Sequence, residues 1–266
     1  YYYPEQWDSS QWERDLKKMS EIGIRFTHFA EFAWGTLEPE EGIYDFEWLD
    51  RAVALAGKYG LKVIMCTPSP TPPVWLSKKY PDILIRRDNG VNIQHGRRQH
   101  ASWSSERYCD FVKNIVTKLA ERYGKNPTVI GWQIDNEPGH YGLVDYSENA
   151  QQKFRLWLRR KYKTIDQLNA TWGNTFWSES YQHFDQIRLP NQQELPEKPN
   201  PHAMLDMNRF MADELAGFVN MQADVLHKNI SEKQWITTNL IPVFNPVDPV
   251  RMDHLDFTTY TRYLVT

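Results

Sequence analysis

Short apolar runs alternate along this chain with longer amphipathic stretches, and this alternation limits the possible folds more than any other feature. Apolar residues at helical spacing, such as Tyr108, Phe111, Val112, Ile115 and Leu119, mark the helical stretches. Strand-like runs are expected at residues 24–32, 61–67, 96–102, 128–136, 235–240 and 255–260. Strands that alternate with helices in this way are typical of βαβ units, whose strands form a parallel sheet.

This pattern favours an α/β fold of the (β/α)8 TIM-barrel type. A doubly wound open sheet is the competing fold, but the Gly-rich phosphate-binding turn of that fold is absent from the sequence. The predicted strands are too few for a closed barrel, and an open barrel would leave sheet edges that invite mispairing. We therefore expect residues 1–266 to form an incomplete (β/α)8 catalytic barrel domain. It would comprise the amino-terminal six or so β/α units of a longer protein, with the last strands missing.

The composition favours a sugar-binding protein over a nucleic-acid-binding or membrane-binding one. The formal net charge is −3 and charged residues make up 24% of the chain, so no strongly basic surface is expected. Aromatic residues make up 14%, including 11 Trp, and such rings stack on the apolar faces of sugars. The alternative is that these bulky side chains only fill a large core. No apolar run is long enough for a membrane span.

The two cysteines, Cys66 and Cys109, are too few for a disulfide framework or a Cys-rich zinc site. Cys66 lies in an apolar run and Cys109 in a helical stretch, so both are expected to be free thiols. Free thiols fit a reducing compartment, and we expect a cytoplasmic location.

The stretch VIGWQIDNEPG, residues 129–139, carries the strongest functional signal. An apolar strand ends there in Asn136 and Glu137. In an α/β barrel, residues at the carboxyl ends of the strands face the substrate. A carboxyl group at that place can donate a proton to a departing oxygen, and an amide beside it can hydrogen-bond a sugar hydroxyl. The alternative is a helix-capping or surface carboxylate in a loop.

Motifs spread over nearly the whole chain resemble glycoside hydrolase family 42, the β-galactosidases. They are YYYPEQW, EFAWGTLEPEEGIYDFEWLD, TPSPTPPVWL, GRRQH, GWQIDNEPG, FRLWLRRKY, LNATWGNTFWSESY and MLDMNRF. The resemblance implies a (β/α)8 catalytic domain, a retaining mechanism and terminal β-D-galactosides as substrates. It also implies a homotrimer and no required metal or organic cofactor. Some members of the family bind zinc through four cysteines, but the corresponding regions here contain none, so we expect no zinc site.

The resemblance also assigns roles to single residues. Glu137 matches the catalytic acid/base, and Asn136 matches its sugar-binding neighbour. Arg98 matches an arginine that reaches the galactose and the Asn-Glu pair. Trp177 falls in the insertion where the family places an aromatic wall of the sugar pocket. Trp34, beyond the end of the first predicted strand, is a further candidate for a pocket wall.

A retaining glycosidase needs a second carboxylate, which serves as the nucleophile. The resemblance places this nucleophile on the seventh strand, beyond residue 266. Glu31 ends the first predicted strand and is expected to contact sugar or to support the structure, but to lie far from Glu137 around the barrel. Asp135, just before Asn136, is not expected to serve as the nucleophile either.

Two other functions stay open at this point. The chain could be a non-catalytic carbohydrate-binding fragment, because it lacks the nucleophile. It could also belong to a related retaining barrel glycosidase that acts on another β-glycoside.

Overall fold

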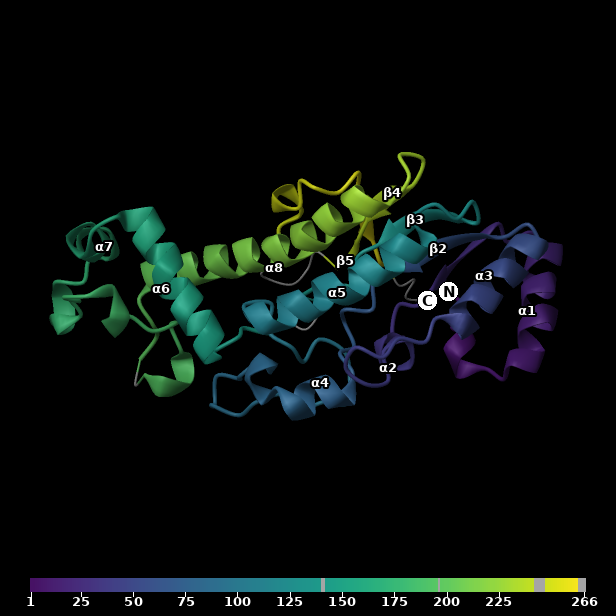
Figure 1. Ribbon diagram of the computed structural model, residues 1–266. Coiled ribbons are helices and arrows are strands. Elements are labelled where there is room, and N and C mark those ends of the chain that lie inside the picture. The colour runs from purple at the N-terminus through teal and green to yellow at the C-terminus, as the bar shows by residue number, and fades with distance from the viewer. Residues whose placement is uncertain (140–141, 196, 242–246, 263–266) are drawn as a thin grey trace.

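A computed structural model describes residues 1–139, 142–195, 197–241 and 247–262 of the chain (Figure 1). Its centre is a parallel four-stranded sheet in the order β1-β2-β3-β4. The strands are β1 (Phe26–Phe29), β2 (Lys62–Cys66), β3 (Val129–Gln133) and β4 (Trp235–Thr237). A separate parallel pair follows, formed by β5 (Asn239–Leu240) and β6 (Thr259–Tyr260). Each connection between neighbouring strands of the main sheet contains helix, as a parallel sheet requires.

One α-helix precedes β1, and the others connect neighbouring strands of the main sheet. They are α1 (Ser9–Glu21), α2 (Trp34–Leu37), α3 (Glu47–Lys58), α4 (Val74–Lys79), α5 (Glu106–Tyr123), α6 (Glu148–Tyr162), α7 (Ile165–Trp172) and α8 (Pro201–Asn229). Single 3-10 turns are η1 (Pro4–Gln6), η2 (Pro81–Ile83), η3 (Phe176–Ser178), η4 (Phe184–Gln186), η5 (Gln192–Glu194) and η6 (Pro249–Arg251). Among the described residues, no helix is both long and apolar enough to cross a membrane.

The expected third strand, within residues 96–102, is wrong. This stretch is a loop whose Ala101 makes only an isolated bridge to Leu84. Gly96 has a φ of 144° and Gln99 a φ of 60°, so the backbone leaves the extended conformation twice within four residues. Asn136 and Glu137 therefore follow the third strand of the sheet, not the fourth. Residues 235–240 instead provide two short strands, β4 and β5.

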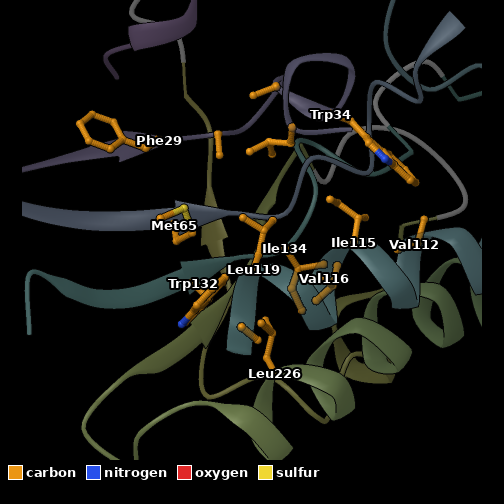
Figure 2. Packing of buried hydrophobic residues seen from close by; sticks show 14 of the residues in the cluster. Phe29, Trp34, Met65, Val112, Ile115, Val116, Leu119, Trp132, Ile134 and Leu226 are labelled. Atoms are coloured by element: carbon orange, nitrogen blue, oxygen red, sulfur yellow. The ribbon is translucent and has the colours of Figure 1, made fainter. Parts of the chain in front are cut away.

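The main core lies between the sheet and the helices that cover it. In Figure 2, Met65 of β2 and Trp132 of β3 lie in the same packed region as Leu119 of α5 and Leu226 of α8. All four side chains are fully buried. Burying a side chain of this kind contributes about 1.5–3 kcal/mol. The apolar spacing that predicts the helix at residues 108–119 thus corresponds to the buried face of α5.

A second hydrophobic cluster lies at the end of the molecule where α6 meets α7 (Figure 1). Phe154 of α6, Trp172 of α7 and Phe210 of α8 belong to it. Asp206 of α8 is buried among these helices and accepts hydrogen bonds from Tyr162 (2.6 Å), Trp172 (3.1 Å) and Lys161. Burial opposes the charge of Asp206, but these donors outweigh it and lower the pKa of the carboxyl group.

Gly131 of β3 allows the close approach of β4. It is the register partner of Trp235, and a Cβ atom at Gly131 would lie 2.3 Å from the indole ring. Gly131→Ala should therefore destabilise the protein by about 1–3 kcal/mol, because the ring has to move and the strand pairing with it. Denaturant unfolding of the full-length protein measures the loss.

Gly217 provides the matched control for this prediction. It lies in α8, and a Cβ atom added there would meet no other atom within 4 Å. Gly217→Ala should therefore leave stability unchanged or raise it by up to about 1 kcal/mol. Equal effects of the two substitutions would contradict the steric role of Gly131.

Candidate active site

The backbone turns sharply just after β3. Asp135 has a φ of 55° and Glu137 a φ of 48°, a conformation that non-glycine residues rarely adopt. Neighbouring elements hold it: Thr67 Oγ1 accepts from the Asp135 amide at 2.8 Å, and Asn239 Oδ1 accepts from the Glu137 amide at 3.0 Å. Backbone strain of this kind, which costs about 1–3 kcal/mol per residue, gathers at functional sites.

Gln99 provides a further support from the loop that was expected to be a strand. Its side-chain amide donates to the main-chain carbonyl oxygens of Asn136 (2.8 Å) and Glu137 (2.7 Å). Sequence reasoning missed both Gln99 and Asn239. Asn239, a polar residue within the run 235–240 that was predicted as a strand, was a usable signal, whereas nothing in the local sequence marks Gln99.

Arg98 connects the two residues that the sequence singled out. Its Nη2 lies 3.0 Å from Oε2 of Glu137, and its Nη1 donates to Oδ1 of Asn136. The Glu137 side chain is 2% exposed, whereas that of Arg98 is 24% exposed. The structure therefore brings together Arg98, Asn136 and Glu137 at the carboxyl end of β3, and of the ion pair only the arginine side reaches solvent.

Glu31 is close to this group, so the expectation that it lies far away is wrong. Its Oε1 accepts from Nδ2 of Asn136 at 2.7 Å and from Nε2 of Gln133 at 2.8 Å. The physical reason is that only β2 separates β1 from β3, so the carboxyl ends of the three strands converge. The expectation assumed one strand more between them. Burial raises the pKa of Glu31, although its hydrogen bonds act in the opposite direction.

Asp135 faces the loop after β2. Its Oδ2 accepts from the Ser69 hydroxyl at 2.6 Å, and its Oδ1 accepts from the Asn136 amide at 2.7 Å. Burial raises the pKa of Asp135 to about 6, against an ordinary value of 3.8. Since β3 ends at Gln133, the turn at Asp135, and not strand alternation, sets the direction of this side chain.

Two clefts open beside Arg98. One, of about 580 Å3, is lined by Phe32, Gly35, Thr71, Pro72, Pro73, Val74, His95, Gly96, Arg97 and Arg98. The other, of about 710 Å3, shares the segment 95–98 with the first. Both volumes suit a sugar-sized ligand. In the described part of the chain, no three His, Cys, Asp or Glu side chains gather as a metal site would require.

Trp34 lines neither of these clefts and is fully buried, so its prediction as a pocket wall is wrong. The side chain is fully buried, its Nε1 donates to Glu38 Oε2 at 2.8 Å, and its ring stacks against Tyr108 at 6.3 Å. An indole with no exposed face cannot stack on a sugar. Trp34 is a core residue, because α2 begins at this position and turns it inward.

Trp177 is not brought to Glu137 within this chain. It lies in η3, which follows α7, and α7 lies at the left end of the molecule, well away from β2 and β3 (Figure 1). The side chain is 65% exposed, and its ring centroid lies 5.4 Å from that of Phe176, which is 73% exposed. Its φ of 60° is again unusual for a non-glycine residue. The described residues therefore do not bring Trp177 to Glu137, and its role as a pocket wall stays a prediction.

Comparisons with known proteins place this arrangement among the glycoside hydrolases. A family model described as Glyco_hydro_42, Beta-galactosidase, matches residues 1–266. The β-galactosidase BgaA of a Thermus species is 39% identical over 98% of this chain and 40% of its own length. The β-galactosidase Bga of Halorubrum lacusprofundi is 39% identical over 90% of this chain and 34% of its own length.

Solved structures agree with these relatives. The β-galactosidase from the psychrophilic Marinomonas ef1 superimposes with a TM-score of 0.94 at 38% identity. It covers 98% of this chain, which spans 40% of that structure. This chain belongs to glycoside hydrolase family 42, and the α/β TIM-barrel class expected from the sequence is confirmed. The chain spans about 40% of the length of the relatives it matches.

The raised pKa of Asp135 predicts how stability depends on pH. Below its ordinary pKa of 3.8 the group is protonated in both the folded and unfolded states. Between about pH 4 and 6 the unfolded state releases this proton while the folded state keeps it, so stability falls as pH rises. The loss should reach ~3 kcal/mol at most, at about 1.4 kcal/mol per pKa unit.

Asp135→Asn removes this titration. Relative to the parent, the variant should gain stability as pH rises from about 4 to 6 and run parallel to the parent above that window. Unfolding midpoints of both full-length proteins across pH 4–7 measure the difference, in which the contributions of other carboxyl groups cancel. Parallel curves over the whole range would show that Asp135 ionises normally in the folded protein.

Proposed function

We propose that this chain supplies the acid/base part of the active site of a retaining β-galactosidase, which removes terminal β-D-galactose from β-galactosides. The observation that carries the proposal is the ion pair between Arg98 and the buried Glu137. Arg98 also bonds to Asn136 and lines both clefts. The relatives, which are named β-galactosidases, support the choice of sugar.

Glu137 acts as the proton donor in this proposal. It protonates the glycosidic oxygen as that bond breaks, and in the second step it takes a proton from water. Arg98 holds the carboxyl group in place through Oε2. The side-chain oxygen and nitrogen of Asn136 can each take part in two hydrogen bonds. With the described residues each makes one, so the amide can also bond a sugar hydroxyl.

The nucleophile of this reaction is proposed to lie beyond residue 266. A retaining enzyme needs its two carboxyl groups about 5–5.5 Å apart. Glu31 is the carboxyl group that the structure brings to Asn136, but it is 1% exposed and accepts three hydrogen bonds. A carboxylate enclosed by donors in this way is a poor nucleophile, because attack would break those bonds.

We propose further that residues 1–266 form one catalytic domain and that the full-length protein is a homotrimer. The exposed pair Phe176 and Trp177 supports an oligomer, because it presents two large aromatic rings to solvent on a projecting turn. Because the family resemblance implies that Trp177 forms a sugar-pocket wall, we propose that it does so in the pocket of a neighbouring subunit. The proposed compartment is the cytoplasm, since both Cys66 and Cys109 are free thiols.

Glu137→Gln in the full-length protein tests the catalytic proposal. The variant should hydrolyse a galactoside with a poor leaving group about 10²–10⁴-fold more slowly, because it cannot donate a proton. A nitrophenyl galactoside, whose leaving group needs less protonation, should lose less in its first step. Rate constants for the two substrates measure the difference.

Further substrates and conditions separate the alternatives. Added azide should restore turnover of the nitrophenyl galactoside by Glu137→Gln, because azide attacks the intermediate without a general base. Parent-like rates on both substrates would refute the assignment of Glu137. Faster hydrolysis of a gluco-, manno- or xyloside than of the matched galactoside would favour another β-glycoside. No turnover of any glycoside would favour a binding function.

Trp177→Ser tests the intersubunit wall. The side chain makes few contacts within the chain, so the thermal midpoint should change by less than about 2 °C, whereas kcat/KM should fall at least about 10-fold. The matched control is Leu205→Ser, at an exposed apolar residue of α8, which should leave both quantities close to the parent values. Parent-like kcat/KM in Trp177→Ser would contradict the proposed wall.

A further inference from the structure

Glu31 is too enclosed to contact a substrate directly. Its Oε1 accepts from Gln133 (2.8 Å) and Asn136 (2.7 Å), and its Oε2 accepts from the Tyr3 hydroxyl (2.7 Å). The residue is 1% exposed. A sugar hydroxyl would have to displace one of these donors to reach it. The expected sugar contact of Glu31 is therefore replaced here by contact with Asn136.

The bonds of Asn136 fix which way its amide points. Nδ2 donates to the Glu31 carboxylate, which only accepts, and Oδ1 accepts from the Arg98 guanidinium, which only donates. Rotation of the amide by 180° would set its NH2 group against the guanidinium and its oxygen against the carboxylate. Two charge-assisted hydrogen bonds would become two repulsions, so a single orientation is selected.

Glu31 is itself held from two other directions. Tyr3 approaches from the segment before η1, and Gln133 from the end of β3, so the carboxylate cannot turn away from Asn136 without losing one of them. The backbone assists at Ala30, whose φ of 71° turns the chain inward directly after β1. A row of contacts thus runs from Tyr3 through Glu31, Asn136 and Arg98 to Glu137.

We propose that Glu31 is a positioning residue that, together with Tyr3 and Gln133, fixes the orientation of the Asn136 amide relative to Arg98 and Glu137. The proposal rests on the function proposed above. In this role Glu31 never touches the substrate. It determines which edge of Asn136 offers a free N–H and which offers a free lone pair to a sugar hydroxyl.

A double-mutant cycle with Glu31→Ala and Asn136→Ala in the full-length protein tests this role. Glu31→Ala should lower kcat/KM about 10–100-fold, because the amide becomes free to rotate. In the Asn136→Ala background, the same substitution should lower kcat/KM less than about 3-fold, because no amide remains to be oriented. Multiplicative losses in the double variant would overturn the proposal.

Two conservative variants guard against simple misfolding. Glu31→Gln keeps an acceptor oxygen for Asn136 and should recover to within about 10-fold of the parent, while Tyr3→Phe removes one support and should cost about 2–5-fold. The matched control is Glu38→Gln, at another buried carboxyl group that accepts from Trp34 and from the Gly42 amide, away from Asn136. Its effect should be the same with and without Asn136. Glu31→Gln as impaired as Glu31→Ala would contradict an orienting role.

A crystal structure of Glu31→Ala provides a readout that does not depend on activity. The Asn136 side chain should adopt a second rotamer, or leave Arg98, while the backbone of residues 135–137 stays in place. An unchanged Asn136 still bonded to Arg98 would overturn the proposal even if activity falls. If the parent protein shows no galactosidase activity, the proposed function is refuted. The crystal structure of Glu31→Ala would still decide whether Glu31 orients Asn136.

Discussion

The guanidinium group of Arg98 interacts electrostatically with three buried carboxyl groups. Arg98 pairs with Glu137, and its charge also acts on Glu31 and on Asp135. Carboxylates withdrawn from water are costly unless cations or hydrogen-bond donors compensate them. The loop at residues 96–99, the turn after β3 and the end of β1 are therefore bound to one another electrostatically. The partial burial of Arg98 strengthens this effect, since less water screens its charge.

Much of the fold follows from the spacing of apolar residues. The helical period at residues 108–119 predicted α5, and the apolar runs at 61–67 and 128–136 predicted β2 and β3. The prediction that Arg98, Asn136 and Glu137 form one group came from the family resemblance. The position of the last two at a strand end supported it. The structure shows the three in contact, while their catalytic roles remain proposals.

The rest depended on interactions that no local pattern records. The stretch 96–102 was expected to be a strand, but its backbone has positive φ angles at Gly96 and Gln99. The Gln99 side chain bonds to residues almost forty positions away. Counting this stretch as a strand put one strand too many between Glu31 and Glu137 in the prediction. The predictions for Trp34 and Trp177 also show that the local sequence does not determine how far a side chain is exposed. Both were chosen as aromatic residues near a strand end or in an insertion, yet one is fully buried and the other projects into solvent.

The long helix α8 belongs to both hydrophobic clusters. Phe210 and Met211 pack with α6 and α7, whereas Phe218 and Leu226, further along the same helix, pack against the main core. The part of the molecule that carries Trp177 is therefore joined to the main core by a continuous helix and not by a flexible loop. Exchanging this part for that of a homologue would require a junction through the buried middle of α8.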